Sequence, residues 1–290
     1  MTKVLIIGAG KMGSAIAKEL AVEGISITLF NRSVSKLDEI KREIDSSTFS
    51  TSVNLLESVP DADIIITLLT SGVIVEELLL APGILQACKP SAIIVDMSTS
   101  GVQTATKLDS AVTSAGLRFV DAPVSGSMAT IASHQLLVMA SGDSGAIKEI
   151  TPTLMKFSKK VSDLGSVGNG QVMKLAVNLI VHTLNAAISE SLAIATTAGI
   201  SIGGAYDILE ESVVASPYLK YKRAAFTTPS TPVAMRIDTV LKDMDLISGL
   251  AQELELKLVA TPAVQQAYAD AVAQGLSERD MASLIEAYKK

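Results

Sequence analysis

The stretch that decides the fold lies near the start of the chain and reads Val4-Leu5-Ile6-Ile7-Gly8-Ala9-Gly10-Lys11-Met12-Gly13. Its four leading apolar residues predict a buried strand, and its three glycines follow with the spacing G-x-G-x-x-G. Gly8 permits a tight turn, Gly10 lets the backbone approach a pyrophosphate, and Gly13 lets a helix pack closely on the strand. The N-terminus of that helix offers unpaired N–H groups to an anion. We therefore predict a dinucleotide-binding turn, the alternative being a glycine turn without a ligand.

Short apolar runs alternate with helical patterns over the first half of the chain. The runs show no polar alternation, which is typical of parallel strands covered by helices on both faces. This βαβ alternation predicts a doubly wound α/β domain of the Rossmann type. The predicted strands are Val4–Ile7, Ser26–Phe30, Ile64–Leu68, Ala92–Val95, Phe119–Val120, Leu136–Ala140 and Lys160–Asp163, and the predicted helices include Met12–Val22, Val34–Ile44 and Val102–Ser114.

The pattern changes after about Gly165. Strand-like runs end and helical periodicity continues to Tyr288, which predicts an all-helical second domain. Asn169-Gly170 marks the start of a long helix that ends near Ala198-Gly199. We place a nucleotide-binding Rossmann domain at 1–164 and an all-helical domain for substrate binding and oligomerisation at 165–290, joined by the long helix.

Composition excludes several classes of function. The chain of 290 residues is 48% hydrophobic but only 3% aromatic, and its net charge is −6. These values argue against nucleic-acid partners, which need a basic surface or stacked aromatic side chains. The single cysteine, Cys88, allows neither an internal disulfide nor a cysteine-based zinc site, and we predict no metal.

Membrane and export segments are not expected either. The longest apolar stretch, between Lys174 and Glu190, contains polar side chains and falls short of the roughly 20 apolar residues that a membrane span needs. Lys3 leads directly into the first strand, without the pattern of a signal peptide. We therefore predict no membrane partner and a cytoplasmic location.

The residues after the second strand indicate which dinucleotide binds. An acidic residue there would accept hydrogen bonds from the ribose 2′-hydroxyl of NAD. The sequence instead has Asn31-Arg32-Ser33. Arg32 can form charge-assisted hydrogen bonds with a 2′-phosphate, so we predict NADP(H). The alternative is a solvated surface arginine.

A polar stripe follows one face of the long helix, at steps of four, four, three and four: Lys174, Asn178, His182, Asn185 and Ser189. Spacing alone leaves Lys174 either at the edge of an apolar surface or functional. For His182 and Asn185 we expect structural, hydrogen-bonded roles. A nicotinamide-dependent reductase needs a proton donor, and His182 lies about 12 Å beyond Lys174 along the helix, so both cannot serve one oxygen.

Four motifs, in the family's order and over essentially the whole chain, resemble the β-hydroxyacid dehydrogenase family. Besides the glycine turn they are Asp121-Ala122-Pro123-Val124-Ser125-Gly126-Ser127, Gly170-Gln171-Val172-Met173-Lys174-Leu175-Ala176-Val177-Asn178 and Lys242-Asp243. The family includes 3-hydroxyisobutyrate dehydrogenases, tartronate semialdehyde reductases and glyoxylate/succinic semialdehyde reductases. The resemblance implies an NADP(H)-dependent enzyme that interconverts a small hydroxyacid or β-hydroxyacid and its oxoacid or semialdehyde by hydride transfer.

The resemblance also implies roles for particular residues. Lys174 is similar to the family's general acid/base and Asn178 to its substrate-orienting amide. Ser125 and Gly126 resemble its substrate-carboxylate anchor. Because Pro123 ends a strand, we expect the segment 124–127 to lie in a loop at the carboxyl edge of the sheet. The glycine turn, the end of the second strand and the resemblance together predict these cofactor-binding residues: Gly8, Ala9, Gly10, Lys11, Met12, Gly13, Asn31, Arg32, Ser33, Leu69, Thr99 and Lys242.

Departures from the family pattern leave the small-molecule substrate open. Ser127 stands where a second glycine is common, a variant more typical of the glyoxylate and succinic semialdehyde reductases. Met235 stands where an aromatic residue is common. Two alternatives remain: an imine reductase-type NADPH enzyme, against which Lys174 and Ser125 argue, and a non-catalytic NADP-binding module. Since the long helix is apolar on more than one face, we also predict a homodimer or homotetramer.

Overall fold

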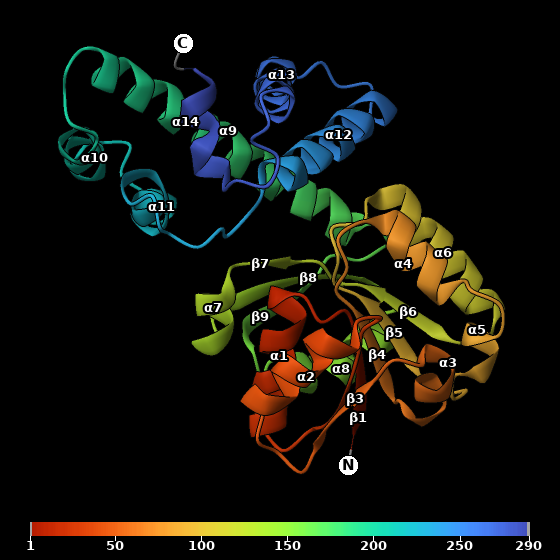
Figure 1. The fold of residues 1–290 in the computed structure, drawn as a ribbon. Helices are drawn as coiled ribbons and strands as arrows, with labels where there is room; N and C mark the ends of the chain where they lie inside the picture. Colours follow the sequence, from red (N-terminus) through yellow and green to blue (C-terminus); the bar gives the residue numbers. More distant parts are fainter. Residues whose placement is uncertain (1, 289–290) are drawn as a thin grey trace. The chain divides into compact units, whose positions relative to one another are not determined.

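The computed structural model describes residues 2–288. The chain divides between Lys174 and Leu175 into two compact units, and each is described by itself. Figure 1 shows a sheet flanked by helices in the first unit and a set of helices in the second. The doubly wound α/β fold followed by an all-helical region is confirmed, whereas the domain boundary between 164 and 165 stays a prediction.

The first unit is built on a nine-stranded sheet with the order β3-β2-β1-β4-β5-β6-β8-β7, in which β9 pairs with β8. Strands β1 to β6 pair in parallel, β8 is antiparallel to β6 and β7, and β9 is parallel to β8. The carboxyl ends of β1 to β6 therefore meet at one edge. The strands are β1 (Lys3–Ile7), β2 (Ser26–Phe30), β3 (Phe49–Ser52), β4 (Ile64–Thr67), β5 (Ile93–Asp96), β6 (Arg118–Asp121), β7 (Val124–Ser125), β8 (Leu136–Gly142) and β9 (Ser158–Asp163).

Helices cover both faces of this sheet, so the inner strands are apolar on both sides. Ile6 packs in one core cluster with Ile16, whereas its neighbour Ile7 packs in the other cluster with Leu108. All four side chains are fully buried, and each contributes about 1.5–3 kcal/mol through burial. The helices are α1 (Lys11–Val22), α2 (Val34–Glu43), α3 (Leu55–Ser58), α4 (Gly72–Leu79), α5 (Ile84–Ala87), α6 (Val102–Ser114), α7 (Met128–Ala132) and α8 (Ser144–Leu154), with a 3₁₀ turn η1 (Val59–Asp61).

The sequence does not predict two of the strands. β3 reads Phe-Ser-Thr-Ser and lies at the edge of the sheet, where polar side chains need no burial on both faces. Its Ser50 hydroxyl lies 3.0 Å from that of Thr28 on β2. β7 falls in the segment expected to be a loop, and it pairs with β8 through Val124 and Ser125. A two-residue strand leaves no periodic pattern in the sequence.

The second unit packs its helices around aromatic and aliphatic side chains. Tyr206 and Tyr268 are fully buried in two separate clusters. The Asn185 amide donates hydrogen bonds to the Tyr268 hydroxyl at 2.9 Å and to the Met281 carbonyl at 2.8 Å, which confirms its structural role. The helices that belong to or enter this unit are α9 (Asn169–Thr197), α10 (Ile202–Glu211), α11 (Pro217–Thr227), α12 (Ile237–Glu253), α13 (Ala260–Ala273) and α14 (Leu284–Ala287), with a 3₁₀ turn η2 (Met281–Ser283).

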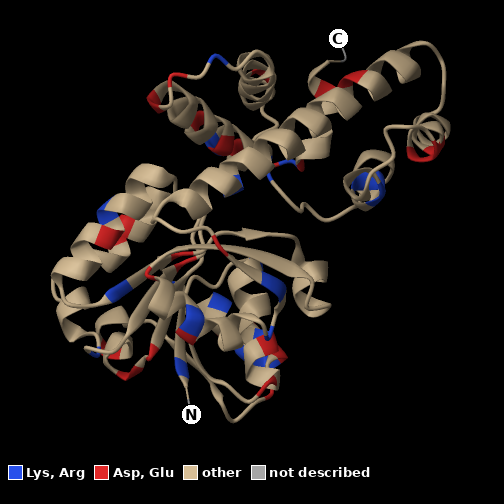
Figure 2. Cartoon of the chain, turned by 180° about the vertical axis from the view of Figure 1, so that it is seen from behind, with Lys and Arg blue, Asp and Glu red and all other residues tan. Residues whose placement is uncertain are grey.

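By length and hydropathy alone, α9 qualifies as a helix that could cross a membrane. The expectation that no apolar stretch is long enough is wrong, because the helix extends beyond Lys174 and Glu190 at both ends to 29 residues. Lys174 and Glu190 are the two charged residues of α9, so most of the helix is tan, the colour of uncharged residues, in Figure 2. We interpret α9 as a core helix because its buried polar side chains form hydrogen bonds, namely Gln171, Asn178, His182, Asn185 and Ser189.

A buried ion pair holds the segment before α12 in the second unit. Lys222 on α11 and Asp280 are both largely buried, with 2.6 Å between Nζ and Oδ1. Asp280 also accepts hydrogen bonds from the backbone N–H groups of Ala234, Met235 and Ala282. Removing one partner of such a buried pair is destabilising, because the other partner is left charged, buried and unpaired.

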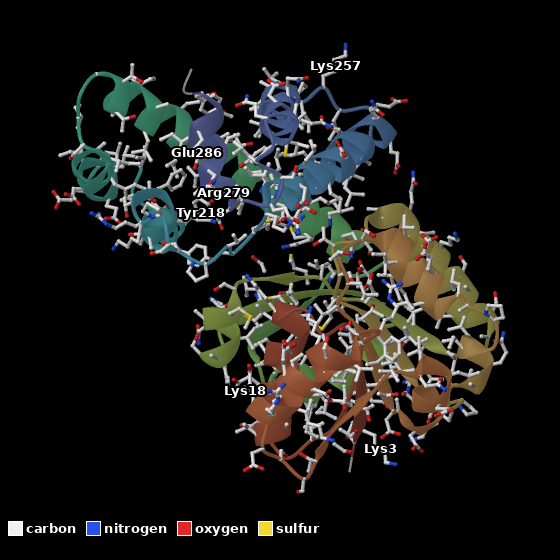
Figure 3. The ribbon with its side chains drawn as sticks, viewed as in Figure 1. Lys3, Lys18, Tyr218, Lys257, Arg279 and Glu286 are labelled. Atoms are coloured by element: carbon white, nitrogen blue, oxygen red, sulfur yellow. The ribbon has the colours of Figure 1, made fainter. Side chains whose placement is uncertain are left out.

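Replacing Asp280 by Ala is expected to lower the free energy of unfolding by about 3–5 kcal/mol, because Lys222 would be left charged and buried without a partner. Chemical denaturation measures the change. Arg279→Ala is the matched control, since Arg279 and Glu286, labelled in Figure 3, form an exposed ion pair 2.8 Å apart. We expect that control to lose at most about 1 kcal/mol. Equal losses in the two variants would contradict this structural role of the buried ion pair.

Candidate active site

The glycine turn connects β1 to α1, and two of its glycines are required by the chain itself. Gly8 has a φ of +121°, and a Cβ there would lie 2.3 Å from the Leu68 carbonyl oxygen. A Cβ on Gly13 would lie 2.0 Å from the Gly8 carbonyl oxygen. Any side chain at either position would displace backbone, so both glycines are explained by the packing of the turn.

Gly10 has a different explanation. Its φ of −75° suits any residue, and a Cβ there would meet no atom within 4 Å. The described neighbours of Gly10 thus leave its backbone open, and the prediction that a pyrophosphate approaches here stays a prediction. α1 begins at Lys11 without a hydrogen bond from a capping side chain. A helix N-terminus that follows a glycine turn in this way is suited to the pyrophosphate of a dinucleotide.

The segment Asn31-Arg32-Ser33 lies beside the glycine turn. The Gly8 N–H donates a hydrogen bond to the Phe30 carbonyl at 3.0 Å, which joins the ends of β1 and β2. Ser33 is the N-cap residue of α2. Arg32 is exposed, and no described carboxylate forms an ion pair with it. Its guanidinium can therefore turn toward a phosphate near the end of β2.

Leu69 and Thr99 lie in the loops after two neighbouring strands, β4 and β5. Ser98 joins these loops, because its hydroxyl accepts a hydrogen bond from the Leu69 N–H at 3.0 Å. The Leu69 side chain also approaches the glycine turn, with its Cδ2 3.1 Å from where a Cβ on Gly8 would lie. The structure thus brings the turn, Leu69 and Thr99 to the same edge of the sheet.

The segment predicted to bind the substrate carboxylate runs from β7 into α7. Ser125 is the last residue of β7, and Gly126 has a φ of +148°, where a Cβ would lie 2.2 Å from the Thr130 Oγ1. The Ser127 N–H donates to the Thr130 Oγ1 at 2.6 Å, as part of a capping box at the start of α7. That N–H is therefore occupied within the chain, and the assignment of Ser125 and Gly126 to a substrate carboxylate stays a prediction.

The start of α9 lies at the same edge of the sheet and leads to Lys174. The backbone N–H of Gln171 donates to Asp121 Oδ2 at 3.0 Å, and its side-chain amide donates to Asp121 Oδ1 at 2.7 Å. Asp121 ends β6 and begins the segment that carries Ser125. Lys174 lies three residues after Gln171, about one helical turn further on.

In the second unit, one buried carboxylate holds two of the predicted site residues. Asp243 on α12 accepts a hydrogen bond from the Asn178 amide at 2.6 Å, and its other oxygen lies 2.8 Å from the Lys242 Nζ. His182 is fully buried, with its Nε2 3.4 Å from Asp243 Oδ2. Burial alone would raise the pKa of Asp243, but the hydrogen bond from His182 and the charge of Lys242 outweigh it and lower that pKa to about 2. Asp243 therefore stays ionised, and it fixes Asn178 beside Lys242.

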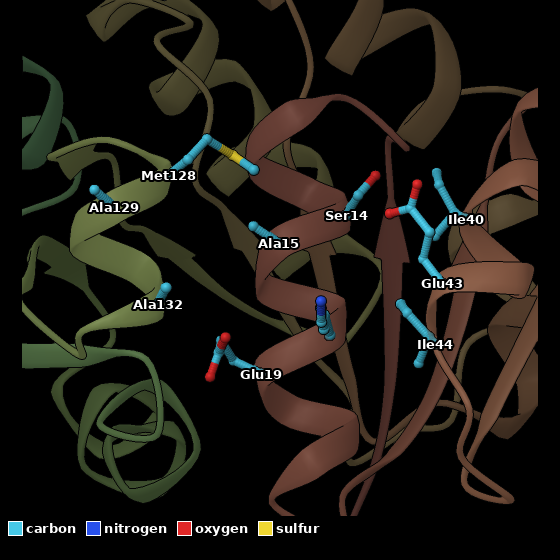
Figure 4. A pocket seen from close by; sticks show the side chains of 10 residues that line it. Ser14, Ala15, Glu19, Ile40, Glu43, Ile44, Met128, Ala129 and Ala132 are labelled. Carbon is cyan, nitrogen blue, oxygen red and sulfur yellow. The ribbon is translucent and has the colours of Figure 1, made fainter.

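A surface groove of about 410 Å³ on the first unit is lined by other residues. It runs between α1, α2 and α7, and Figure 4 shows its lining residues Ala15, Ile44 and Met128. None of the predicted site residues lines it. The groove is therefore a separate feature from the candidate site.

Sequence reasoning assigned no role to three residues that organise the candidate site. Asp121 and Gln171 are 50 residues apart in the sequence, and no spacing pattern predicts that they meet. The position of Asp243 could have indicated a role in the site, because this acid directly follows Lys242, a predicted cofactor-binding residue. Its contact with Asn178 depends on the packing of α12 against α9, which periodicity does not reveal.

These features define a nicotinamide-nucleotide-dependent oxidoreductase: a parallel sheet with a dinucleotide turn, followed by a helix that begins at a lysine-bearing motif. Comparison with protein families agrees. Residues 3–165 match the NAD binding domain of 6-phosphogluconate dehydrogenase, and residues 168–288 match the NAD-binding region of NADP-dependent 3-hydroxyisobutyrate dehydrogenase. The chain belongs to the β-hydroxyacid dehydrogenase family, as the sequence motifs predict, and its cofactor is a pyridine nucleotide.

The similarity to individual relatives extends over essentially the whole chain. Glyoxylate/succinic semialdehyde reductase 1 of Arabidopsis thaliana is 32% identical over 289 residues, which are 99% of this chain and 98% of the relative. The cytokine-like nuclear factor N-PAC of Homo sapiens is 30% identical over 287 residues, and this chain spans 51% of its length. The solved structure of a 3-hydroxyisobutyrate dehydrogenase from Salmonella typhimurium has the same fold, with a TM-score of 0.90, 23% identity and 99% coverage of both chains.

The different explanations for Gly10 and Gly13 lead to opposite expectations for their alanine variants. Gly10→Ala is expected to weaken NADPH binding at least about tenfold, a loss of about 1.4 kcal/mol, with little change in Tm. Gly13→Ala is expected to lower Tm, because its Cβ would collide with backbone. Titration of NADPH fluorescence and thermal unfolding measure the two effects. Unchanged NADPH affinity in Gly10→Ala would show that no ligand approaches this residue.

Proposed function

We propose that the protein is an NADP(H)-dependent reductase or dehydrogenase that interconverts a small hydroxyacid and its semialdehyde or oxoacid. One observation carries this proposal. The segment that contains Ser125 and the helix turn that leads to Lys174 are joined by the Asp121–Gln171 hydrogen bonds at the edge where the glycine turn lies. A carboxylate anchor, an acid/base and a dinucleotide turn at one sheet edge are the parts that such a reaction needs.

When bound, a reduced nicotinamide supplies a hydride to the carbonyl carbon of the substrate. The role that we propose for Lys174 is to donate a proton to the oxygen that becomes a hydroxyl, and to accept it in the reverse direction. Ser125 and Gly126 hold the substrate carboxylate, and Asn178, one turn beyond Lys174, orients the reacting oxygen. Asp243 supports this arrangement by fixing the Asn178 amide.

Two features support the substrate class that we propose. The whole-length similarity to a glyoxylate/succinic semialdehyde reductase favours a small aldehyde with a carboxylate. Ser127 stands where many family members have glycine, and its N–H caps α7 through Thr130. The anchor therefore has a restricted set of donors, which suits one carboxylate group. We also propose a homodimer or homotetramer, supported by exposed isoleucines on α9, where Ile180 and Ile194 are 68% and 73% exposed.

The proposed role of Lys174 predicts a large loss of kcat in Lys174→Met. Proton transfer by a positioned side chain contributes about 10²–10⁴-fold, so kcat for glyoxylate or succinic semialdehyde should fall by that factor. The affinity for NADPH should stay within about twofold, because Lys174 acts on the substrate. Lys18→Met, a change of an exposed lysine on α1, is the control and should keep full activity. A Lys174→Met protein that keeps most of its kcat would falsify the mechanism, and a wild type inactive toward every aldehyde, oxoacid and imine tested would favour a non-catalytic module.

Arg32 is predicted to set the preference for NADP(H). Wild type should use NADPH with a higher kcat/KM than NADH. In Arg32→Ala the ratio of these values should fall at least about tenfold, because charge-assisted hydrogen bonds contribute about 1.5–3 kcal/mol. Arg42→Ala is the control, since Arg42 lies on α2 and its Nε donates to the Asp38 carbonyl. The assignment is wrong if the two variants change the ratio equally.

A further inference from the structure

We propose that Asp121 is a positioning residue: its buried carboxylate fixes the first turn of α9 to the sheet and so sets the place of Lys174. The proposal rests on the function proposed for Lys174. It concerns the residues that hold the helix, and these have no direct part in the transfer of hydride or proton.

The start of α9 is capped by side chains from two strands. Asp121 Oδ2 accepts hydrogen bonds from the Gln171 N–H and the Ser141 hydroxyl, both at 3.0 Å. The Ser141 oxygen in turn accepts from the Gly170 N–H at 2.9 Å. The first N–H groups of a helix have no partner within the helix. Here β6 and β8 supply those partners, so the direction in which α9 leaves the sheet depends on Asp121 and Ser141.

The Gln171 side chain can adopt only one orientation of its amide. Its oxygen accepts hydrogen bonds from the N–H groups of Ser100 and Gly101, each at 3.1 Å. Its nitrogen must therefore donate, and it does so to the Ser98 carbonyl at 3.0 Å and to Asp121 Oδ1 at 2.7 Å. Gln171 is fully buried, and each of these four hydrogen bonds would be unsatisfied if the amide turned.

Gly170 adds a steric constraint that is independent of these hydrogen bonds. A Cβ at this position would lie 2.5 Å from the Met139 carbonyl oxygen and 2.7 Å from Asp121 Oδ2. It would also lie 3.1 Å from Pro123 Cδ, within the segment that carries Ser125. The helix can approach the sheet this closely only because residue 170 has no side chain.

These constraints act on Lys174 through the helix. Lys174 follows Gln171 by three residues, which places the two on neighbouring turns about 4.5 Å apart along the axis. A shift of the first turn therefore moves the lysine amine relative to the segment 125–126. A misplacement of about 1 Å at a reacting group can lower a rate by about 100-fold.

The charge on Asp121 makes this capping dependent on pH. Burial and the neighbouring Asp96, opposite it on β5, raise the pKa of Asp121 to about 7. The groups that face it from β8 and α9, Ser141 and Gln171, are neutral. The ionised form accepts all three hydrogen bonds, so kcat should fall as the pH falls below about 7. Stability should change in the opposite sense: a carboxyl whose folded pKa is raised contributes most below its ordinary pKa and loses that contribution as the pH rises through about 7.

The central test is Asp121→Asn, in which the new N–H₂ faces a donor of Gln171 in either orientation of the amide: the side-chain N–H₂ or the backbone N–H. We expect kcat to fall about 10–100-fold, while the affinity for NADPH and the KM for the aldehyde change less than about threefold. The decline of kcat below about pH 7 should disappear. Amide hydrogen exchange of residues 170–174 in the protein without ligands should become faster. Adding Gln171→Glu to Asp121→Asn should restore part of kcat, because the new carboxylate accepts a hydrogen bond from the new amide. The rescue should be partial, because the Ser98 carbonyl, which accepts from Gln171 in the wild type, would then face a second acceptor.

Two further variants keep the proposal testable if Asp121→Asn does not fold. Gly170→Ala leaves the carboxylate intact and displaces the helix by its Cβ, so kcat should fall while the dependence on pH remains. Leu154→Ala removes a fully buried side chain of α8 and should lower Tm with full kcat. Loss of Tm with full kcat in Asp121→Asn or Gly170→Ala would overturn the proposal. Full kcat in Lys174→Met would instead overturn the proposed function and leave the exchange result unaffected.

Discussion

The start of α9 depends on a carboxylate buried without a cation. Asp121 forms no ion pair with a described lysine or arginine, and neutral donors from Gln171 and Ser141 solvate it. This arrangement joins the strand that precedes the substrate segment to the helix that carries Lys174. Asp243 in the second unit is the opposite case, because it forms an ion pair with Lys242. The pKa of Asp121 is raised to about 7 and that of Asp243 is lowered to about 2, so of these two carboxyls Asp121 is the one that titrates near neutral pH.

Three of the glycines named above are required by the fold, whereas Gly10 is the one at which we propose that a ligand approaches the backbone. Gly8, Gly13 and Gly170 each lie where a Cβ would collide with backbone, so they report how closely the turn, the first helix and the long helix approach the sheet. Gly10 lies in open space with an ordinary φ. The open space at Gly10 leaves room for a dinucleotide to approach the backbone of the turn, as the proposed cofactor site requires.

Much of this account could be predicted from the sequence, and the remainder could not for identifiable reasons. Apolar runs such as Ile64–Leu68 predict parallel strands because burial on both faces removes polar alternation. The edge strand β3 lacks that signal, and the two residues of β7 are too few to carry one. The structural role of Asn185 followed from its apolar surroundings. The Asp121–Gln171 contact joins distant parts of the chain, and such a contact depends on tertiary packing that local patterns do not contain.

We propose that this sheet edge binds NADP(H) and that Lys174 donates the proton when a small carboxylate-bearing aldehyde is reduced there. The most direct measurement follows NADPH absorbance at 340 nm: it should fall when the wild-type protein meets glyoxylate, succinic semialdehyde or tartronate semialdehyde with NADPH, and rise with 3-hydroxyisobutyrate and NADP⁺. The account predicts turnover of at least one of them, faster with the phosphorylated cofactor than with NADH or NAD⁺. Tight binding of NADPH with no turnover of any substrate would contradict it.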